Sequence, residues 1–257
     1  MAVIEVEGCI LRTMDYRDRD RIISVLTPSH GRLDMIARGA RKSFKRFGGH
    51  LQLFTCAVLT LDYKETSTLH GLRSAVARES FQALQGDLTR FAVASYLGEV
   101  ALRTASTGER DPASYRTFVA LLERLVQVHP GGEEWLLRIG QAAMLDRRGV
   151  LADFERCTCG HPIVLSEVVW RTVPESALRC STCAPQSGRV ERIELPIARA
   201  LQAVGRSVRG HDPGAAVTSA ALRGAGRVLD ESVAELVGAP LKSEAFLASM
   251  LTDVVSN

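Results

Sequence analysis

The sequence of 257 residues predicts an α+β multidomain protein with an OB-fold β-barrel at the N-terminus and an α-helical domain after it. Three observations predict this architecture. Short apolar and β-branched runs fill the first 78 residues, the apolar period becomes helical from about residue 80, and two tight cysteine pairs interrupt the helical part. We therefore expect an OB-fold domain at residues 1–78, and a helical domain at residues 79–257 with a zinc finger inserted at about 154–186.

Five apolar runs are the expected strands. They cover residues 3–11, 22–26, 33–37, 55–63 and 69–77. Between the second and third runs lies a segment with turn chemistry, Thr27-Pro28-Ser29-His30-Gly31, which predicts a hairpin. Five short strands in fewer than about eighty residues favour a small barrel such as the OB-fold, which closes its edges and presents one face and its loops to nucleic acid.

Helical periodicity predicts six helices after the barrel. Asp87 is the candidate N-cap of a helix at 88–101, and Asp111 with Pro112 starts a second at 112–126, because proline is tolerated at the first helical position. The remaining helices are expected at 135–148, 196–209, 212–236 and 243–255. Their apolar stripes are interpreted as the core-facing sides of a bundle.

Four of the six cysteines have metal-site spacing. Thiolates suit tetrahedral Zn²⁺, and two Cys-containing turns separated by twenty residues can close four sulfurs around one ion. The first pair is tighter than the usual two-residue interval, and Gly160 would relieve its turn. His161 is a spare ligand, and a redox disulfide pair or unliganded thiols are the alternatives. A closed four-sulfur site predicts one structural Zn²⁺, held by Cys157, Cys159, Cys180 and Cys183.

The redox environment supports the metal interpretation. No apolar run approaches the length of a membrane span, and the first residues lack the pattern of a signal peptide, so we expect a cytoplasmic protein without a membrane partner. Thiols stay reduced there, which favours metal over disulfide. Cys9 and Cys56 stand alone in apolar stretches and are expected in the core.

Positive charge is concentrated near the N-terminus. The net charge is +3, yet residues 1–80 hold 13 Lys and Arg against 9 Asp and Glu. Five of these cations fall within residues 38–47, where Phe44 and Phe47 interleave with them. Cations neutralise phosphates and aromatic rings stack on unpaired bases, so the segment fits single-stranded nucleic acid. The alternative is a solvated loop whose phenylalanines pack into the barrel.

Catalysis is not expected. Asp15, Asp18 and Asp20 could hold Mg²⁺ for a nuclease, but the arginines between them would compete, and no further acidic cluster completes a two-metal site. The sequence also lacks a phosphate-binding P-loop, a dinucleotide fingerprint, a zinc-protease helix and a serine-hydrolase elbow. The chain is therefore predicted to be a non-enzyme.

The segments LTPSHGRL at 26–33 and IARGARKS at 36–43, followed by helices with a cysteine finger inside them, resemble the RecO family of bacterial recombination mediators. The likeness covers essentially the whole chain. It implies a DNA repair and recombination protein, active after DNA damage, that binds single-stranded DNA and anneals complementary strands. It also implies that the protein works with RecR to load recombinase onto strands coated by single-strand DNA-binding protein.

The same resemblance implies further ligands and residues. It suggests double-stranded DNA as a ligand, RecF and RecA as additional partners, and a nucleoid-associated bacterial protein. The resemblance implies that the family's basic barrel surface corresponds here to Arg32, Arg38, Arg41 and Lys42. Asp34 is acidic in a strand where relatives are often basic, so we expect the phosphate contacts in the loop more than in the strand. With the rest of the basic segment, the expected DNA-binding residues are Arg32, Arg38, Arg41, Lys42, Lys45 and Arg46.

Two other classes of function remain open at this point. A zinc-containing RNA-binding or transcription factor with an OB-fold is one, because the barrel and basic loop would serve RNA equally well. Affinity for matched DNA and RNA oligomers separates it from a DNA repair mediator. A metal-dependent hydrolase is the other, and it would show turnover that depends on added divalent ions.

Overall fold

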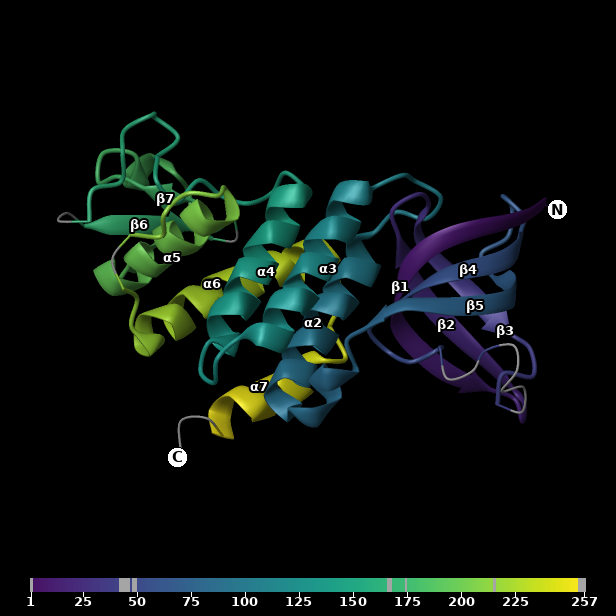
Figure 1. The fold of residues 1–257 in the computed structure, drawn as a ribbon. Coiled ribbons are helices and arrows are strands. Elements are labelled where there is room, and N and C mark those ends of the chain that lie inside the picture. The colour runs from purple at the N-terminus through teal and green to yellow at the C-terminus, as the bar shows by residue number, and fades with distance from the viewer. Residues whose placement is uncertain are drawn as a thin grey trace. The chain divides into compact units, whose positions relative to one another are not determined.

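The computed structural model describes residues 2–41, 47, 50–165, 168–173, 175–214 and 216–253. The chain divides into two compact units. The first consists of Met1–Glu133 with Leu241–Asn257, and the second of Glu134–Pro240. Strands dominate the start of the chain and helices follow, so the predicted α+β class is confirmed (Figure 1). None of the helices in the described ranges is long and apolar enough to cross a membrane.

Five strands form a closed barrel in the order β1-β2-β3-β5-β4. Neighbouring strands are antiparallel except β3 and β5, which run parallel and pair through Met35 with His70 and Ile36 with Gly71. The expected hairpin between the second and third strands is present. This order is that of the OB-fold predicted from the sequence. The strands are β1 (Ala2–Tyr16), β2 (Asp20–Thr27), β3 (Gly31–Ala37), β4 (Thr55–Tyr63) and β5 (His70–Ser80).

Two glycines allow the barrel to close tightly. At Gly8 a Cβ atom would lie 2.4 Å from a methyl group of Val25, so only glycine lets β1 approach β2 there. Gly31 has a φ of +58° at the start of β3, and a Cβ atom would lie 2.0 Å from the carbonyl oxygen of Ser106. The turn that begins β3 can therefore lie directly against the chain after the first long helix.

The barrel interior corrects one sequence interpretation. Phe47, expected to offer a face to bases, is 2% exposed and packs among the aliphatic side chains of the barrel core. Burial of this ring stabilises the barrel, because it removes a large apolar area from water. Phe44 lies outside the described residues. Cys9 and Cys56 are buried, as their apolar surroundings predicted, and they are paired across β1 and β4.

The first unit also contains a short 3-10 helix and three α-helices. The predicted caps are confirmed, because Asp87 accepts a hydrogen bond from the Arg90 amide at 3.0 Å and Asp111 accepts one from the Ser114 amide at 3.0 Å. Helix α2 packs against α3, α7 and the barrel strands β1 and β2. The elements are η1 (Gln82–Gly86), α2 (Leu88–Thr104), α3 (Pro112–Gln127) and α7 (Glu244–Asp253).

The second unit contains helices and a small sheet that was not predicted. Helix α5 packs on α6, and Arg138 of α4 donates to Asp230 of α6 at 3.2 Å. Helix α6 begins seven residues later than expected, with Thr218 as its N-cap, after a stretch that contains Pro213 and Gly214 (φ +86°). The elements are α4 (Glu133–Arg147), β6 (Val169–Thr172), β7 (Leu178–Arg179), η2 (Ala184–Gln186), β8 (Val190–Ile193), α5 (Leu195–Val208) and α6 (Ser219–Val237).

Candidate functional site

Each cysteine pair lies on a tight turn of the second unit. In the first turn, the Gly160 amide donates to the Cys157 carbonyl at 2.8 Å, and the Cys157 amide donates to the His161 carbonyl at 2.9 Å. Gly160 has a φ of +85°, the conformation that the tight spacing required. In the second turn, which follows β7, the Cys183 amide donates to the Cys180 carbonyl at 3.1 Å. Backbone hydrogen bonds within each turn thus hold both thiols of a pair on the same side of that turn.

The four sulfur atoms come together as predicted. The Sγ atoms of the four cysteines all lie within 4.8 Å of one another, and those of Cys159 and Cys180 are 3.9 Å apart. Sulfurs bound tetrahedrally to zinc at about 2.3 Å would be about 3.8 Å from one another. The donor set and its spacing therefore fit a tetrahedral thiolate site. Across the described part of the chain, this is the one group of three or more side chains placed to hold a metal ion.

The ionisation of the cluster also fits a cation. Burial raises the pKa of the Cys157 thiol, but hydrogen bonds from the backbone amides of Cys159 and Cys180 and with neighbouring thiols outweigh it and lower that pKa to about 6. Hydrogen bonds with the Cys159, Cys157 and Cys180 thiols raise the pKa of Cys183 to about 12. Four thiols this close resist full ionisation because thiolates repel. A bound divalent metal ion removes that obstacle, since it deprotonates its thiol ligands.

The distances in this cluster bear on two alternatives, a disulfide bond and His161 as a ligand. The cysteines are free thiols, and the 3.9 Å between the sulfurs of Cys159 and Cys180 is far beyond the ~2.05 Å of a disulfide bond. The spare ligand His161 places its Nδ1 atom 3.3 Å from the Cys159 sulfur. The four-sulfur set is complete without this histidine, which contacts one of the ligands instead.

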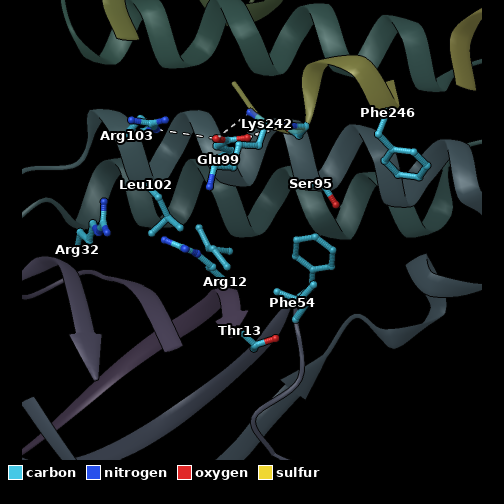
Figure 2. Close-up of a pocket in the computed structure, with 13 residues that line it drawn as sticks. Arg12, Thr13, Arg32, Phe54, Ser95, Glu99, Leu102, Arg103, Lys242 and Phe246 are labelled. Atoms are coloured by element: carbon cyan, nitrogen blue, oxygen red, sulfur yellow. Dashed lines mark hydrogen bonds and ion pairs between the residues drawn. The ribbon is translucent and has the colours of Figure 1, made fainter. Parts of the chain in front are cut away.

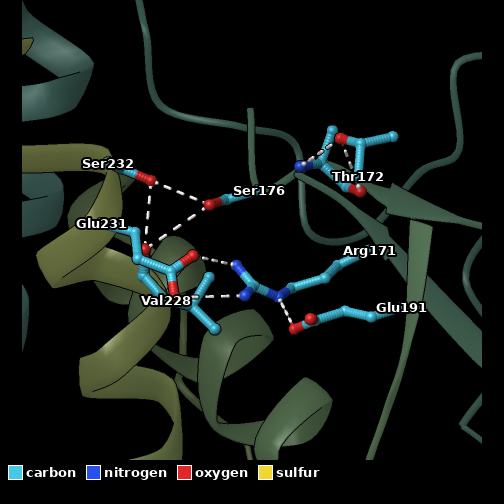
Figure 3. A network of polar contacts seen from close by, with 8 residues as sticks. Arg171, Thr172, Ser176, Glu191, Val228, Glu231 and Ser232 are labelled. Carbon is cyan, nitrogen blue, oxygen red and sulfur yellow. Dashed lines mark hydrogen bonds and ion pairs between the residues drawn. The ribbon is translucent and has the colours of Figure 1, made fainter. Parts of the chain in front are cut away.

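A buried arginine fastens the sheet beside the cysteines to helix α6 (Figure 3). Arg171 of β6, with a side chain 7% exposed, donates to both carboxylate oxygens of Glu231 at 2.6 and 3.2 Å, and also binds Glu191 of β8. Beside it, the hydroxyl groups of Ser176 and Ser232 are 3.1 Å apart. Sequence reasoning missed this anchor, because one arginine among 28 carries no local signal.

The barrel cations differ in how strongly they are already paired. Arg32 donates to Asp34 through Nε at 3.2 Å and Nη2 at 2.8 Å, a forked contact within β3. Arg38 is exposed just after β3. Arg41 is exposed, with its Nε atom 3.7 Å from Asp15 and its Nη1 atom donating to the Asp18 carbonyl at 3.4 Å. The other three expected DNA-binding residues lie outside the described residues: Lys42, Lys45 and Arg46.

Two of the acidic residues around the turn between β1 and β2 already have hydrogen-bond or ion-pair partners. Asp15 accepts from Arg21 at 3.0 and 3.1 Å and lies beside Arg41. Asp20 accepts from the Gly39 amide at 2.8 Å. Arginine therefore occupies the Asp15 carboxylate, although the arginines are Arg21 and Arg41 and not the two between the acids, and this pairing disfavours Mg²⁺ binding at Asp15.

The barrel and the cysteine cluster together define an α+β protein with an OB-fold and a four-thiol finger. Comparison with known families agrees with this class. The family model "Recombination protein O N terminal" matches residues 1–81, and the model "Recombination protein O C terminal" matches residues 85–245. The chain therefore belongs to the RecO family, as the resemblance in its sequence implied.

Individual relatives support the same assignment. The DNA repair protein RecO of Geobacter metallireducens (strain ATCC 53774 / DSM 7210 / GS-15) is 31% identical over 255 residues, which cover 98% of this chain and 100% of that protein. The DNA repair protein RecO of Anaeromyxobacter sp. (strain K) is 33% identical over 196 residues, or 76% of this chain and 74% of the relative. The similarity extends through both units of the chain.

Proposed function

We propose that this protein is a non-enzymatic DNA repair and recombination mediator. It binds single-stranded DNA, anneals complementary strands and, with RecR, helps to load recombinase onto strands coated by single-strand DNA-binding protein. One observation carries the proposal: models of both halves of the RecO family match the chain in order over residues 1–81 and 85–245.

The DNA-binding surface is assigned to the barrel, residues 1–78. Exposed Arg38 and Arg41 supply cations directly after β3, and the basic residues Lys42, Lys45 and Arg46 follow them in the sequence. Each cation that neutralises a phosphate releases counterions, so binding falls as salt rises. Arg32 contributes less than these residues because Asp34 already occupies its fork.

The metal is proposed to be one structural zinc ion held by the four clustered cysteines. Four sulfurs within 4.8 Å of one another support it. A site with four thiolates leaves no open position for substrate, so its binding energy serves folding. The zinc finger, at about 154–186, and the helices of residues 79–257 then act as scaffold and as surface for protein partners.

The wider setting follows from membership of the family. The proposed ligands are single- and double-stranded DNA, and the proposed partners are RecR and single-strand DNA-binding protein, with RecF and RecA as further members of the pathway. The proposed location is the bacterial cytoplasm, at the nucleoid, because these ligands and partners are proposed to act there.

The test that separates this proposal from an RNA-binding factor is a direct comparison of nucleic acids. Binding of dye-labelled DNA and RNA oligomers of the same sequence and length is measured by fluorescence anisotropy at several salt concentrations. We expect single-stranded DNA to bind at least as tightly as RNA. A clear preference for RNA at every salt concentration would favour the alternative, because it would indicate contacts to the 2′-hydroxyl.

A further inference from the structure

A cavity of about 590 Å³ lies within the first unit, beside the barrel strand β1, helix α2 and the segment that leads into α7 (Figure 2). Pockets of roughly 300–1,000 Å³ hold small molecules in proteins. The floor of this cavity is apolar and includes Phe54 and Phe246. Its rim carries four cations: Arg12, Arg32, Arg103 and Lys242.

The one carboxylate among the described lining residues already has hydrogen-bond and ion-pair partners. Glu99 of α2 accepts hydrogen bonds from the Ser243 amide at 2.9 Å, the Ser243 hydroxyl at 2.8 Å and the Lys242 amide at 3.1 Å. Arg103 lies 3.9 Å from the same carboxylate. Glu99 thus holds the segment before α7 against α2, and the charge of Arg103 offsets the repulsion that this carboxylate would exert on an anion in the cavity.

Two rim cations lack a counter-charge. Lys242 is exposed, and its ammonium group has no hydrogen-bond or ion-pair partner among the described residues. Arg12 is exposed on β1, where its guanidinium contacts the Met14 sulfur at 3.7 Å and no carboxylate within the described ranges. Cations that line a cleft with low-dielectric walls concentrate anions there.

We propose that this cavity holds one nucleotide of a single DNA strand, with its phosphates on Arg12 and Lys242 and its base against Phe246. Phe246 is half-buried and lies edge-on to Phe91, with ring centroids 6.3 Å apart. Base stacking on aromatic side chains tolerates any base, as a sequence-independent binder requires. Arg32, part of the proposed barrel surface, also lines the cavity, so the strand path continues from β3 towards α2 and α7.

This inference rests on the proposed function and specifies an additional part of the DNA site. The experiment measures anisotropy of a dye-labelled oligothymidine and of an abasic oligomer with the same length and charge. The variants are R12A/K242A, which removes two rim cations, and F246L, which keeps apolar volume but removes the ring. The matched control is R116A/R124A, which removes two exposed arginines of α3 in the same unit. Far-UV circular dichroism checks that each variant is folded.

The two variants, R12A/K242A and F246L, are expected to affect DNA binding differently. R12A/K242A should weaken oligothymidine binding about tenfold and reduce the slope of log affinity against log salt by about 1.4, since each single-strand phosphate contact accounts for about 0.7. The control should change affinity about twofold or less. F246L should reduce the preference for oligothymidine over the abasic strand about fivefold and leave abasic binding unchanged.

Failure of the inference can be told apart from failure of the proposed function. If the natural protein binds no single-stranded DNA, the proposed function is wrong. If it binds DNA and R12A/K242A behaves like the control, the cavity is not part of the DNA site. Equal losses on both strands in F246L would overturn the base contact. Unchanged DNA binding in R12A/K242A with lost binding of a glutamate-rich peptide would assign the cavity to an acidic protein segment and overturn the proposal.

Discussion

Single buried charges hold segments that are far apart in the sequence. Arg171 joins β6 and β8 to helix α6, and Glu99 of α2 joins the segment before α7. Both side chains are largely buried and hydrogen-bonded at several atoms, so removing either one leaves polar partners without their bonds. These two residues therefore give the most direct mutational tests at this scale.

Replacing Arg171 with alanine is expected to lower the free energy of unfolding by about 2–3 kcal/mol. The value lies below the full cost of breaking a buried ion pair, because Glu191 and Glu231 are about half exposed and return to water. Urea unfolding followed by circular dichroism measures the change. The control is R199A, which removes an exposed arginine of α5. Equal midpoints for the two variants would show that the network is not stabilising.

Replacing Glu99 with glutamine should make stability less dependent on pH. Burial raises the pKa of Glu99, but hydrogen bonds from the Lys242 and Ser243 amides and the Ser243 hydroxyl, with the charge of Arg103, outweigh it and lower the pKa. A lowered pKa in the folded state contributes stability above the unfolded value of about 4.3, which is lost as pH falls below it. The urea midpoint should therefore drop less between pH 6 and pH 3.5 in E99Q. An identical drop in both proteins would contradict this.

At the scale of elements, long periodic segments were predictable and short ones were not. The barrel strands and the caps Asp87 and Asp111 follow from alternation and local hydrogen bonding, which the sequence carries directly. Strands β6, β7 and β8 have two to four residues, too few for a period to be detected. The burial of Phe47 among barrel side chains is a tertiary contact, which the local sequence does not specify.

Of the two candidate sites, the sequence predicts the cysteine cluster and does not predict the cavity. The cysteine cluster was predictable because spacing alone brings paired ligands together. The rim of the cavity was not predictable, because its cations Arg12, Arg103 and Lys242 lie far apart in the sequence, on β1, on α2 and between α6 and α7. Only the folded unit brings those cations to one place.

The proposed zinc ion is expected to stabilise the cysteine finger. Protein purified without chelator is expected to carry one zinc per chain by elemental analysis, and Cys180→Ser should lower this well below one equivalent, because three thiolates bind the ion more weakly. Hydrogen exchange should then become faster in β6, β7 and β8. Cys9→Ala, which changes a buried thiol of the barrel, should leave metal content unchanged. A natural protein with far less than one equivalent of zinc would contradict the assignment.

The basic segment after β3 should set the salt dependence of DNA binding. Combined replacement of Arg41, Lys42, Lys45 and Arg46 with alanine should reduce the slope of log affinity against log salt by up to about 3, since each phosphate contact on a single strand accounts for about 0.7. Anisotropy titrations from low to high salt measure the slope, and R116A/R124A, which removes two exposed cations of α3, is the control for loss of surface charge elsewhere. A slope equal to that of the natural protein would place the phosphate contacts elsewhere.

At the scale of the whole molecule, the central proposal is that a cationic barrel promotes the pairing of DNA strands without consuming ATP. Two single strands repel through their phosphates, and a protein that neutralises both while leaving bases accessible lowers that barrier. The sequence has no P-loop to hold ATP. The first unit supplies the barrel, and the second unit supplies the cysteine finger. Annealing should therefore need the protein and the two strands alone.

Stopped-flow annealing of dye-labelled complementary strands tests this claim most directly. We expect the protein to accelerate annealing well above the protein-free rate, equally with and without ATP, and to lose most of the acceleration at high salt because screening weakens phosphate contacts. A rate no faster than the protein-free control, or strict dependence on ATP, would contradict the account.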